Sequence, residues 1–222
     1  MPINHQNKYI FIHIPKTGGT SIENFLDLCN PSNHFADEVW FFQKGVKYNY
    51  QHLTAFIYKT YGFLKREDFE TYFKFTFVRN PYDRCVSEFF FSKGGHKKDI
   101  SIPAWVNIKP KIDFIDFSPK AFSEFLVRLS NNSLKAHDML QSHFILDENQ
   151  NSLVDFIGKY ENLKEDLAKI LDILKINKSI NELPHSYKNL IPYDKSKYLI
   201  PKNKELIYDK FKKDFEIFGY EK

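Results

Sequence analysis

A short apolar run followed at once by a turn with two glycines and one lysine lies near the start of the chain. Residues 9–14 are apolar or aromatic except for His13, and Lys16, Gly18 and Gly19 follow directly. The glycines let backbone N–H groups approach a ligand closely, and a helical pattern that starts next adds about half a positive charge. The lysine adds a full charge. This combination predicts a site for a phosphate-like anion.

A nucleoside triphosphatase is the first alternative to consider for such a site. Its loop pattern, G-x-x-x-x-G-K-[ST], is not matched, because Lys16 precedes the glycines and the first glycine is missing. A triphosphatase also needs a carboxylate at the end of a second strand to hold Mg²⁺. Here the second strong apolar run, residues 73–78, ends at Arg79. A cation at that point favours a site where protein cations, with no metal, hold the phosphate.

Apolar runs that alternate with amphipathic segments position these residues. We expect strands at 8–14, 73–78 and 153–160, where short runs are rich in β-branched or aromatic residues. The i, i+3, i+4 spacing and the Asn, Ser and Pro start signals predict helices at 22–29, 53–61, 66–72, 81–90, 119–129, 162–174 and 201–218. Strand and helix alternation predicts a single α/β domain over 1–222, with three αβα layers around a mostly parallel sheet. Residues 32–50 stay unassigned, and 93–117 form a long loop of the kind that serves as a lid or binding loop.

Composition excludes several classes of protein. The chain has 222 residues, a formal net charge of +4 and two cysteines. Two thiols make neither a disulfide framework nor a metal-ligand pattern, and the basic residues form no block typical of a nucleic-acid-binding arm. No apolar run is long enough to span a membrane, and the first eight residues are too polar for a signal peptide. We therefore expect a cytoplasmic protein without a nucleic-acid partner.

Four segments resemble the carbohydrate sulfotransferase family, whose relatives include the heparan 2-O- and chondroitin 4-O-sulfotransferases. They are HIPKTGGTS at 13–21, FVRNPYDR at 77–84 followed by Ser87, VDFIGKYENL at 154–163, and DFEIFGY at 214–220. Each segment alone is moderately specific, whereas all four in the right order are strong. The resemblance extends from near residue 9 to residue 220.

The resemblance implies a P-loop-NTPase-like sulfotransferase fold and a PAPS-dependent carbohydrate sulfotransferase. PAPS is 3'-phosphoadenosine 5'-phosphosulfate, the donor of the sulfuryl group. The matched positions for its 5'-phosphosulfate are Lys16, Thr17, Gly18, Gly19, Thr20 and Ser21. Arg79 and Ser87 match the pair that holds the 3'-phosphate, and an arginine fork with a hydroxyl is a suitable receptor for such a group. Lys16 is also expected to stabilise charge on the oxygen that leaves.

Transfer to a sugar hydroxyl needs a group that takes the hydroxyl proton, and histidine suits this task near neutral pH. His52 precedes a predicted helix and is similar to the family's catalytic histidine in a His-x-Thr setting, so we expect it to be the base. His137 is the second candidate, in a segment that resembles one near the acceptor in the family. Gln141 of that segment is expected to contact the sugar. His13 is interpreted as structural, and a carboxylate base stays open because some relatives use glutamate.

Two other functions stay open at this point. One is a nucleotide-dependent kinase with a degenerate P-loop, and the other is a non-catalytic nucleotide-binding module. Animal relatives act in the Golgi behind a membrane anchor, so the lack of one here favours a bacterial enzyme that sulfates a carbohydrate precursor inside the cell. The identity of the sugar and the oligomeric state are not set by the sequence.

Overall fold

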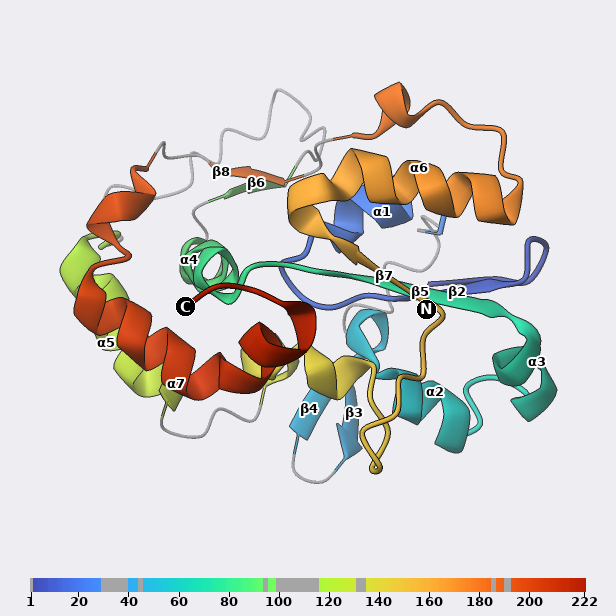
Figure 1. Ribbon diagram of the computed structural model, residues 1–222, viewed down its shortest axis with the longest axis horizontal. Coiled ribbons are helices and arrows are strands. Elements are labelled where there is room, and N and C mark those ends of the chain that lie inside the picture. The colour runs from blue at the N-terminus through green and yellow to red at the C-terminus, as the bar shows by residue number, and fades with distance from the viewer. Residues whose placement is uncertain are drawn as a thin grey trace, which may run out of the picture.

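The central sheet is mostly parallel, as predicted (Figure 1). The structure is a computed structural model that describes residues 2–28, 40–43, 46–93, 96–98, 116–130, 135–184, 187–189 and 193–222. Within it, four strands lie in the order β1-β2-β5-β7: Ile3–Asn4, Tyr9–Ile12, Phe73–Val78 and Phe156–Lys159. Strand β1 is antiparallel to β2, whereas β2, β5 and β7 run parallel. The carboxyl ends of the three parallel strands therefore share one edge, which is where a site is expected.

Helices cover both faces of this sheet, which confirms the predicted α/β class (Figure 1). On one face lie α1 (Gly19–Phe25) and α6 (Leu163–Leu174), and on the other α2 (Ala55–Thr60) and α3 (Arg66–Thr71). A group of three helices packs beyond the carboxyl ends of the strands: α4 (Pro81–Ser92), α5 (Pro119–Ser130) and α7 (Pro201–Phe218). Among the described residues, no helix combines the length and apolar character needed to cross a membrane.

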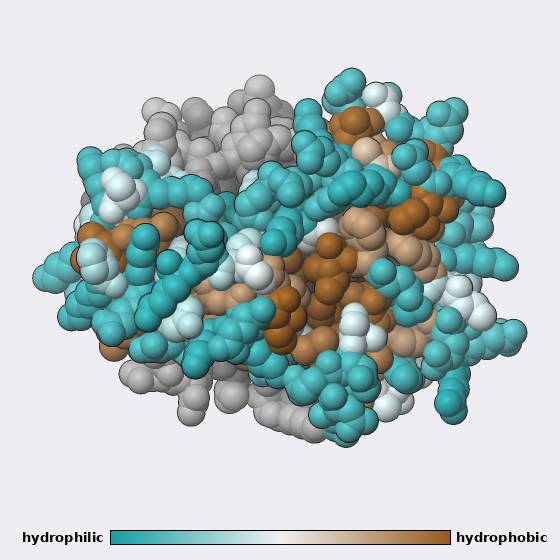
Figure 2. All heavy atoms as spheres, in the orientation of Figure 1, coloured by the Kyte–Doolittle hydropathy of each residue, from teal (hydrophilic) through white to brown (hydrophobic). Residues whose placement is uncertain are grey.

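Successive side chains of a buried strand point to opposite faces of the sheet, so the core around the sheet has one layer on each face. Tyr9 and Phe11 of β2 pack in the cluster that contains α1 and α6 residues, whereas Ile10 and Ile12 pack with α2 residues. All four are fully buried, so β2 is covered on both faces. Strands β1 and β7 form the two edges of the sheet. Figure 2 shows apolar side chains gathered over the centre of that view, where the sheet of Figure 1 lies.

Several element boundaries differ from the sequence prediction. Helix α1 ends at Phe25 because Asp27 adopts a positive φ of 55°, so the predicted extension to Cys29 is wrong, and Cys29 itself lies outside the described residues. The predicted strand 153–160 is paired only at Phe156–Lys159. The start of α4 is confirmed, with the Asn80 side chain accepting a hydrogen bond from the backbone N–H of Tyr82 at 2.9 Å.

Two small antiparallel pairs were not foreseen. The unassigned segment contains β3 (Trp40–Gln43) and β4 (Val46–Asn49), which pair with each other. Strand β6 (His96–Lys98), inside the predicted long loop, pairs with β8 (Tyr187–Asn189). Most of the remaining residues of that loop lie outside the described part of the chain.

Candidate active site

The loop between β2 and α1 has an unusual backbone that two arginines hold in place. Lys16 has a φ of 70° and Gly18 a φ of 86°. The left-handed conformation is costly for a lysine and is found where surrounding structure enforces it, often at functional sites. Here Arg84 Nε donates to the Pro15 carbonyl at 3.1 Å, and Arg79 Nη1 donates to the Lys16 carbonyl at 3.3 Å. The loop is therefore anchored to β5 and α4.

A cavity of about 250 Å³ opens against this loop and collects most of the predicted site residues. It is lined by His13, Lys16, Gly18, Gly19, Thr20, Ser21, Arg79, Ser87, Tyr160, Leu163, Lys164, Leu183 and Pro184. Segments from four parts of the chain thus meet at the carboxyl ends of the strands. Thr17 differs from its neighbours, because its buried hydroxyl donates to the Ile14 carbonyl at 2.9 Å and so stabilises the loop from inside.

Both loop glycines are closely approached by aromatic rings. A Cβ on Gly19 would lie 2.1 Å from Cδ2 and Nε2 of His13, and a Cβ on Gly18 would lie 3.0 Å from the Tyr160 ring. Neither glycine can carry a side chain without displacing a ring that lines the cavity. The spacing of the loop therefore depends on these rings as well as on the glycines.

We expect Gly19→Ala to disrupt the loop severely. The His13 ring cannot move away easily, because its Nδ1 contacts the Glu23 carboxylate at 2.8 Å. Overpacking of this kind typically lowers the free energy of unfolding by about 1–3 kcal/mol. Thermal unfolding measures that loss, and anion affinity measures the damage to the loop. Gly62→Ala is the control for the added methyl group, since no atom lies within 4 Å of its Cβ position, although its φ of 71° adds a backbone strain that Gly19 does not have. It should lose stability through backbone strain alone and keep its anion affinity. Unchanged binding by Gly19→Ala would contradict the close packing of His13 against the loop.

Three of the described residues that line the cavity are cationic, Lys16, Arg79 and Lys164, and two of them lie over aromatic rings. The Lys16 ammonium lies 3.7 Å from the centre of the Phe91 ring. Burial, partly opposed by the Glu88 carboxylate and assisted by Arg79 and Arg84, lowers the Lys16 pKa from 10.5 to about 8. The Arg79 guanidinium lies 4.1 Å from the centre of the Tyr160 ring. Its Nε is buried and has no hydrogen-bond partner among the described residues. A buried, unpartnered guanidinium N–H beside a cavity fits an anionic ligand.

Gln141 has a position that the sequence did not indicate. It is fully buried, with its side-chain oxygen accepting from the Arg79 N–H and its side-chain nitrogen donating to the Arg79 carbonyl, both at 2.8 Å. Its own backbone N–H donates to Asp214 of α7 at 2.7 Å. These bonds fix the backbone of Arg79 at the end of β5. In this geometry Gln141 positions an arginine instead of facing a sugar.

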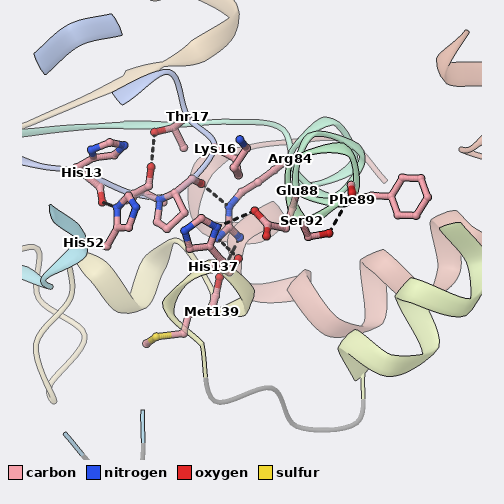
Figure 3. Close-up of polar contacts among 12 residues, drawn as sticks. His13, Lys16, Thr17, His52, Arg84, Glu88, Phe89, Ser92, His137 and Met139 are labelled. Carbon is pink, nitrogen blue, oxygen red and sulfur yellow. Dashed lines mark hydrogen bonds and ion pairs between the residues drawn. The ribbon is translucent and has the colours of Figure 1, made fainter. Parts of the chain in front are cut away.

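Three histidine rings lie in a row beside the lysine loop (Figure 3). His52, at the end of the 3₁₀ turn Tyr50–His52, lies between His13 and His137, with ring centres 4.5 Å and 5.1 Å away. Its Nδ1 donates to the His13 carbonyl at 3.0 Å. Because a carbonyl can only accept, this bond places the hydrogen on Nδ1 and makes Nε2 the basic nitrogen.

The surroundings keep His52 neutral. Burial, followed by the neighbouring histidines His13 and His137, lowers the His52 pKa well below 6.5. At neutral pH its ring therefore lacks the extra proton and can accept one. The structure therefore places a neutral imidazole next to the loop that carries Lys16.

Glutamates support both flanking histidines. Nδ1 of His13 contacts Glu23 of α1 at 2.8 Å, and Nδ1 of His137 contacts Glu88 of α4 at the same distance. The sequence interpretation missed both carboxylates, although each is an acidic residue at a buried position of its helix. It also treated His13 as structural, whereas the ring lines the cavity. Among the described residues, no group of three or more His, Cys, Asp or Glu side chains is arranged to hold a metal ion.

Comparisons with known proteins identify the wider group. A family model described as "Sulfotransferase family" matches residues 1–221, which is nearly the whole chain. No curated protein and no solved structure matches the chain. The match covers the loop, Arg79, the three histidines and α7 together, so the site lies wholly within the matched region.

Proposed function

The chain belongs to the sulfotransferase family, and from this we propose that it transfers a sulfuryl group from PAPS to a hydroxyl of a carbohydrate acceptor. Membership in the family accounts for the transfer of a sulfuryl group. The identity of the donor, the acceptor and the base is our proposal. The observation that carries it is the meeting of Lys16, Arg79 and Ser87 in one cavity beside the neutral His52.

In this proposal, different residues of the cavity hold the two anionic groups of PAPS. We assign the 5'-phosphosulfate to the loop from Lys16 to Ser21, where the glycines leave the backbone accessible. We assign the 3'-phosphate to Arg79 and Ser87, which line the cavity from β5 and α4. The buried Arg79 Nε, which lacks a partner in the described structure, supports this assignment because a phosphate oxygen would satisfy it. The 3'-phosphate distinguishes PAPS from ATP, so Arg79 is the residue that selects the donor.

The proposed reaction places a base on one side of sulfur and a cation on the other. His52 accepts the proton of the acceptor hydroxyl at Nε2 while Nδ1 stays bonded to the His13 carbonyl. The hydroxyl oxygen forms a bond to sulfur as the bond from sulfur to the 5'-phosphate breaks in line. Lys16 supplies positive charge beside the oxygen that leaves. Positioning and preorganised charge contribute most of the acceleration in such a site.

Titration calorimetry with 3'-phosphoadenosine 5'-phosphate (PAP), the product that keeps both phosphates, tests the donor assignment. We expect PAP to bind more tightly than ATP with Mg²⁺, and Arg79→Ala to weaken PAP at least about tenfold, because charge-assisted hydrogen bonds contribute about 1.5–3 kcal/mol. Arg66→Ala is the matched control, since Arg66 is an exposed arginine on α3.

Other results would select one of the alternatives. Indifference to PAP together with magnesium-dependent binding of a triphosphate would support a kinase. Tight PAP binding without transfer of sulfate from PAPS to any sugar in an acceptor panel would support a non-catalytic module. Transfer to a panel member would also define the sugar and the hydroxyl.

A further inference from the structure

Each proposed transfer leaves one proton on a buried histidine. The acceptor hydroxyl loses a proton, sulfur exchanges one oxygen partner for another, and PAP leaves with the electron pair of the broken bond. The proton that remains on Nε2 of His52 must leave before the next cycle. His52 is only 7% exposed, so it needs a partner to return this proton to water. This argument rests on the proposed function.

We infer that His137, oriented by Glu88, carries the proton from His52 to solvent. The His137 ring lies 5.1 Å from the His52 ring, centre to centre, and at 86° to it. Ring centres at this distance bring the edge of one ring against the face of the other, so the two imidazoles are direct neighbours. His137 acts through His52 and is therefore a positioning and relay residue, distinct from the base itself.

The hydrogen bond to Glu88 gives His137 the tautomer that a relay needs. The Glu88 carboxylate accepts from Nδ1–H at 2.8 Å, which leaves Nε2 of His137 to receive a proton. When that proton arrives, both nitrogens carry hydrogen, and the carboxylate stabilises the resulting imidazolium. Nε2 then releases the proton to water, and the starting state is restored. No other reactant is consumed.

The backbone and ring of His137 are also fixed in place (Figure 3). Arg84 Nη2 donates to the His137 carbonyl at 3.0 Å. The Phe91 ring stacks on the imidazole with an interplanar angle of 20° and a centre-to-centre distance of 5.3 Å. A histidine held at its carbonyl, its Nδ1 and its ring face has little freedom, so Nε2 stays aimed in one direction.

Solvent exposure indicates which of the two histidines that flank His52 can pass the proton to water. The His13 and Glu23 side chains are 4% and 3% exposed, and His13 lines the cavity that we assign to the donor, so bound PAPS or PAP would keep a proton on His13 from water. The His137 side chain is 23% exposed and that of Glu88 is 10% exposed. The Glu88 carboxylate contacts Nδ1 of His137, and the Arg84 guanidinium binds the carbonyl oxygen of the same residue. The route to water therefore runs through His137.

Rescue by a small base tests this relay. We expect His137→Ala to bind PAP like the wild type but to lower the steady-state turnover number about tenfold or more, while the first turnover with enzyme in excess falls less. Added imidazole should restore the steady-state rate, because it can occupy the space left by the ring. His137→Asn keeps a donor for Glu88 without a basic nitrogen, so it should be slow and not rescued. His143→Ala, which alters an exposed histidine outside the cavity, is the control and should turn over normally.

Each result bears on the inference separately from the proposed function. A wild-type protein that transfers no sulfate would remove the proposed function and the relay with it. A fully active wild type with unimpaired His137→Ala would overturn the relay alone. So would a slow His137→Ala whose first and later turnovers fall equally and do not respond to imidazole, because such a residue acts on the transfer step.

Discussion

Replacing Lys16 by alanine should lower the turnover number about 10²–10³-fold while PAP affinity falls far less. The loss of one preorganised charge aimed at a developing anion typically has an effect of this size. Lys16 reaches the cavity from a strained loop, and its ammonium is held over Phe91 near Glu88. Steady-state kinetics with PAPS and calorimetry with PAP separate the two effects. A turnover number that stays at the wild-type value would refute the role of Lys16 in stabilising the leaving oxygen.

Two further variants make this result interpretable. Lys16→Gly should be as slow as Lys16→Ala, since both lack the charge, but glycine tolerates the φ of 70° that this position requires. A shared defect in both variants therefore reports the missing ammonium instead of backbone strain. Lys59→Ala is the lysine control, because Lys59 is a surface residue of α2 paired with Glu70. It should leave both turnover and PAP binding unchanged.

The lowered pKa of Lys16 predicts how this effect depends on pH. With a pKa of about 8 in the free enzyme, the lysine is charged below pH 8 and loses its proton above it. The value of kcat/KM should therefore fall by roughly tenfold per unit above pH 8, since it reports groups of the free enzyme. Bound phosphosulfate adds negative charge and raises the Lys16 pKa, so the fall in kcat should occur at higher pH. Lys16→Ala should lack this alkaline fall in kcat/KM.

The strand-loop-helix unit and Arg79 could be predicted because the residues that define each feature are neighbours in the sequence. The runs that became β2 and β5 are short and rich in β-branched or aromatic residues, and the turn glycines closely follow one of them. The parallel pairing of β2 with β5 then brings the two strand ends together. Local patterns were sufficient to identify residues that line one cavity, because the parallel pairing places both strand ends at the same edge of the sheet.

The supporting residues could not be predicted, because their partners lie far away in the sequence. Gln141 looked like a sugar contact beside His137, yet the Arg79 backbone and Asp214 of α7 bind it in the interior. Tyr160 contacts both Gly18 and Arg79, which no spacing along the chain indicates. The hairpin β3–β4 was missed for a different reason, since its segment showed no clear period of hydrophobic residues. These roles depend on contacts between segments that are far apart in the sequence, and local patterns do not contain that information.

His52 is the residue whose replacement should separate binding from chemistry most clearly. His52→Ala should bind PAP like the wild type, because its ring lies away from the two phosphate subsites we assign, but transfer should fall about 10²–10⁴-fold, as expected for the loss of a general base. His52→Asn is the sharper variant. Its amide N–H can replace the Nδ1 bond to the His13 carbonyl, which preserves local packing, while it offers no basic nitrogen.

The pair of variants also distinguishes a histidine base from the carboxylate alternative. If His52 is the base, both variants should be slow at every pH, and the stable fold of His52→Asn should show in an unchanged thermal midpoint and PAP affinity. If a glutamate takes the proton instead, His52→Asn should keep near-normal turnover, since it retains the bond that holds the segment, and Glu88 would become the residue to replace next. Loss of PAP binding together with transfer would instead assign His52 a structural role, because the His13 carbonyl it bonds belongs to the residue that packs against Gly19.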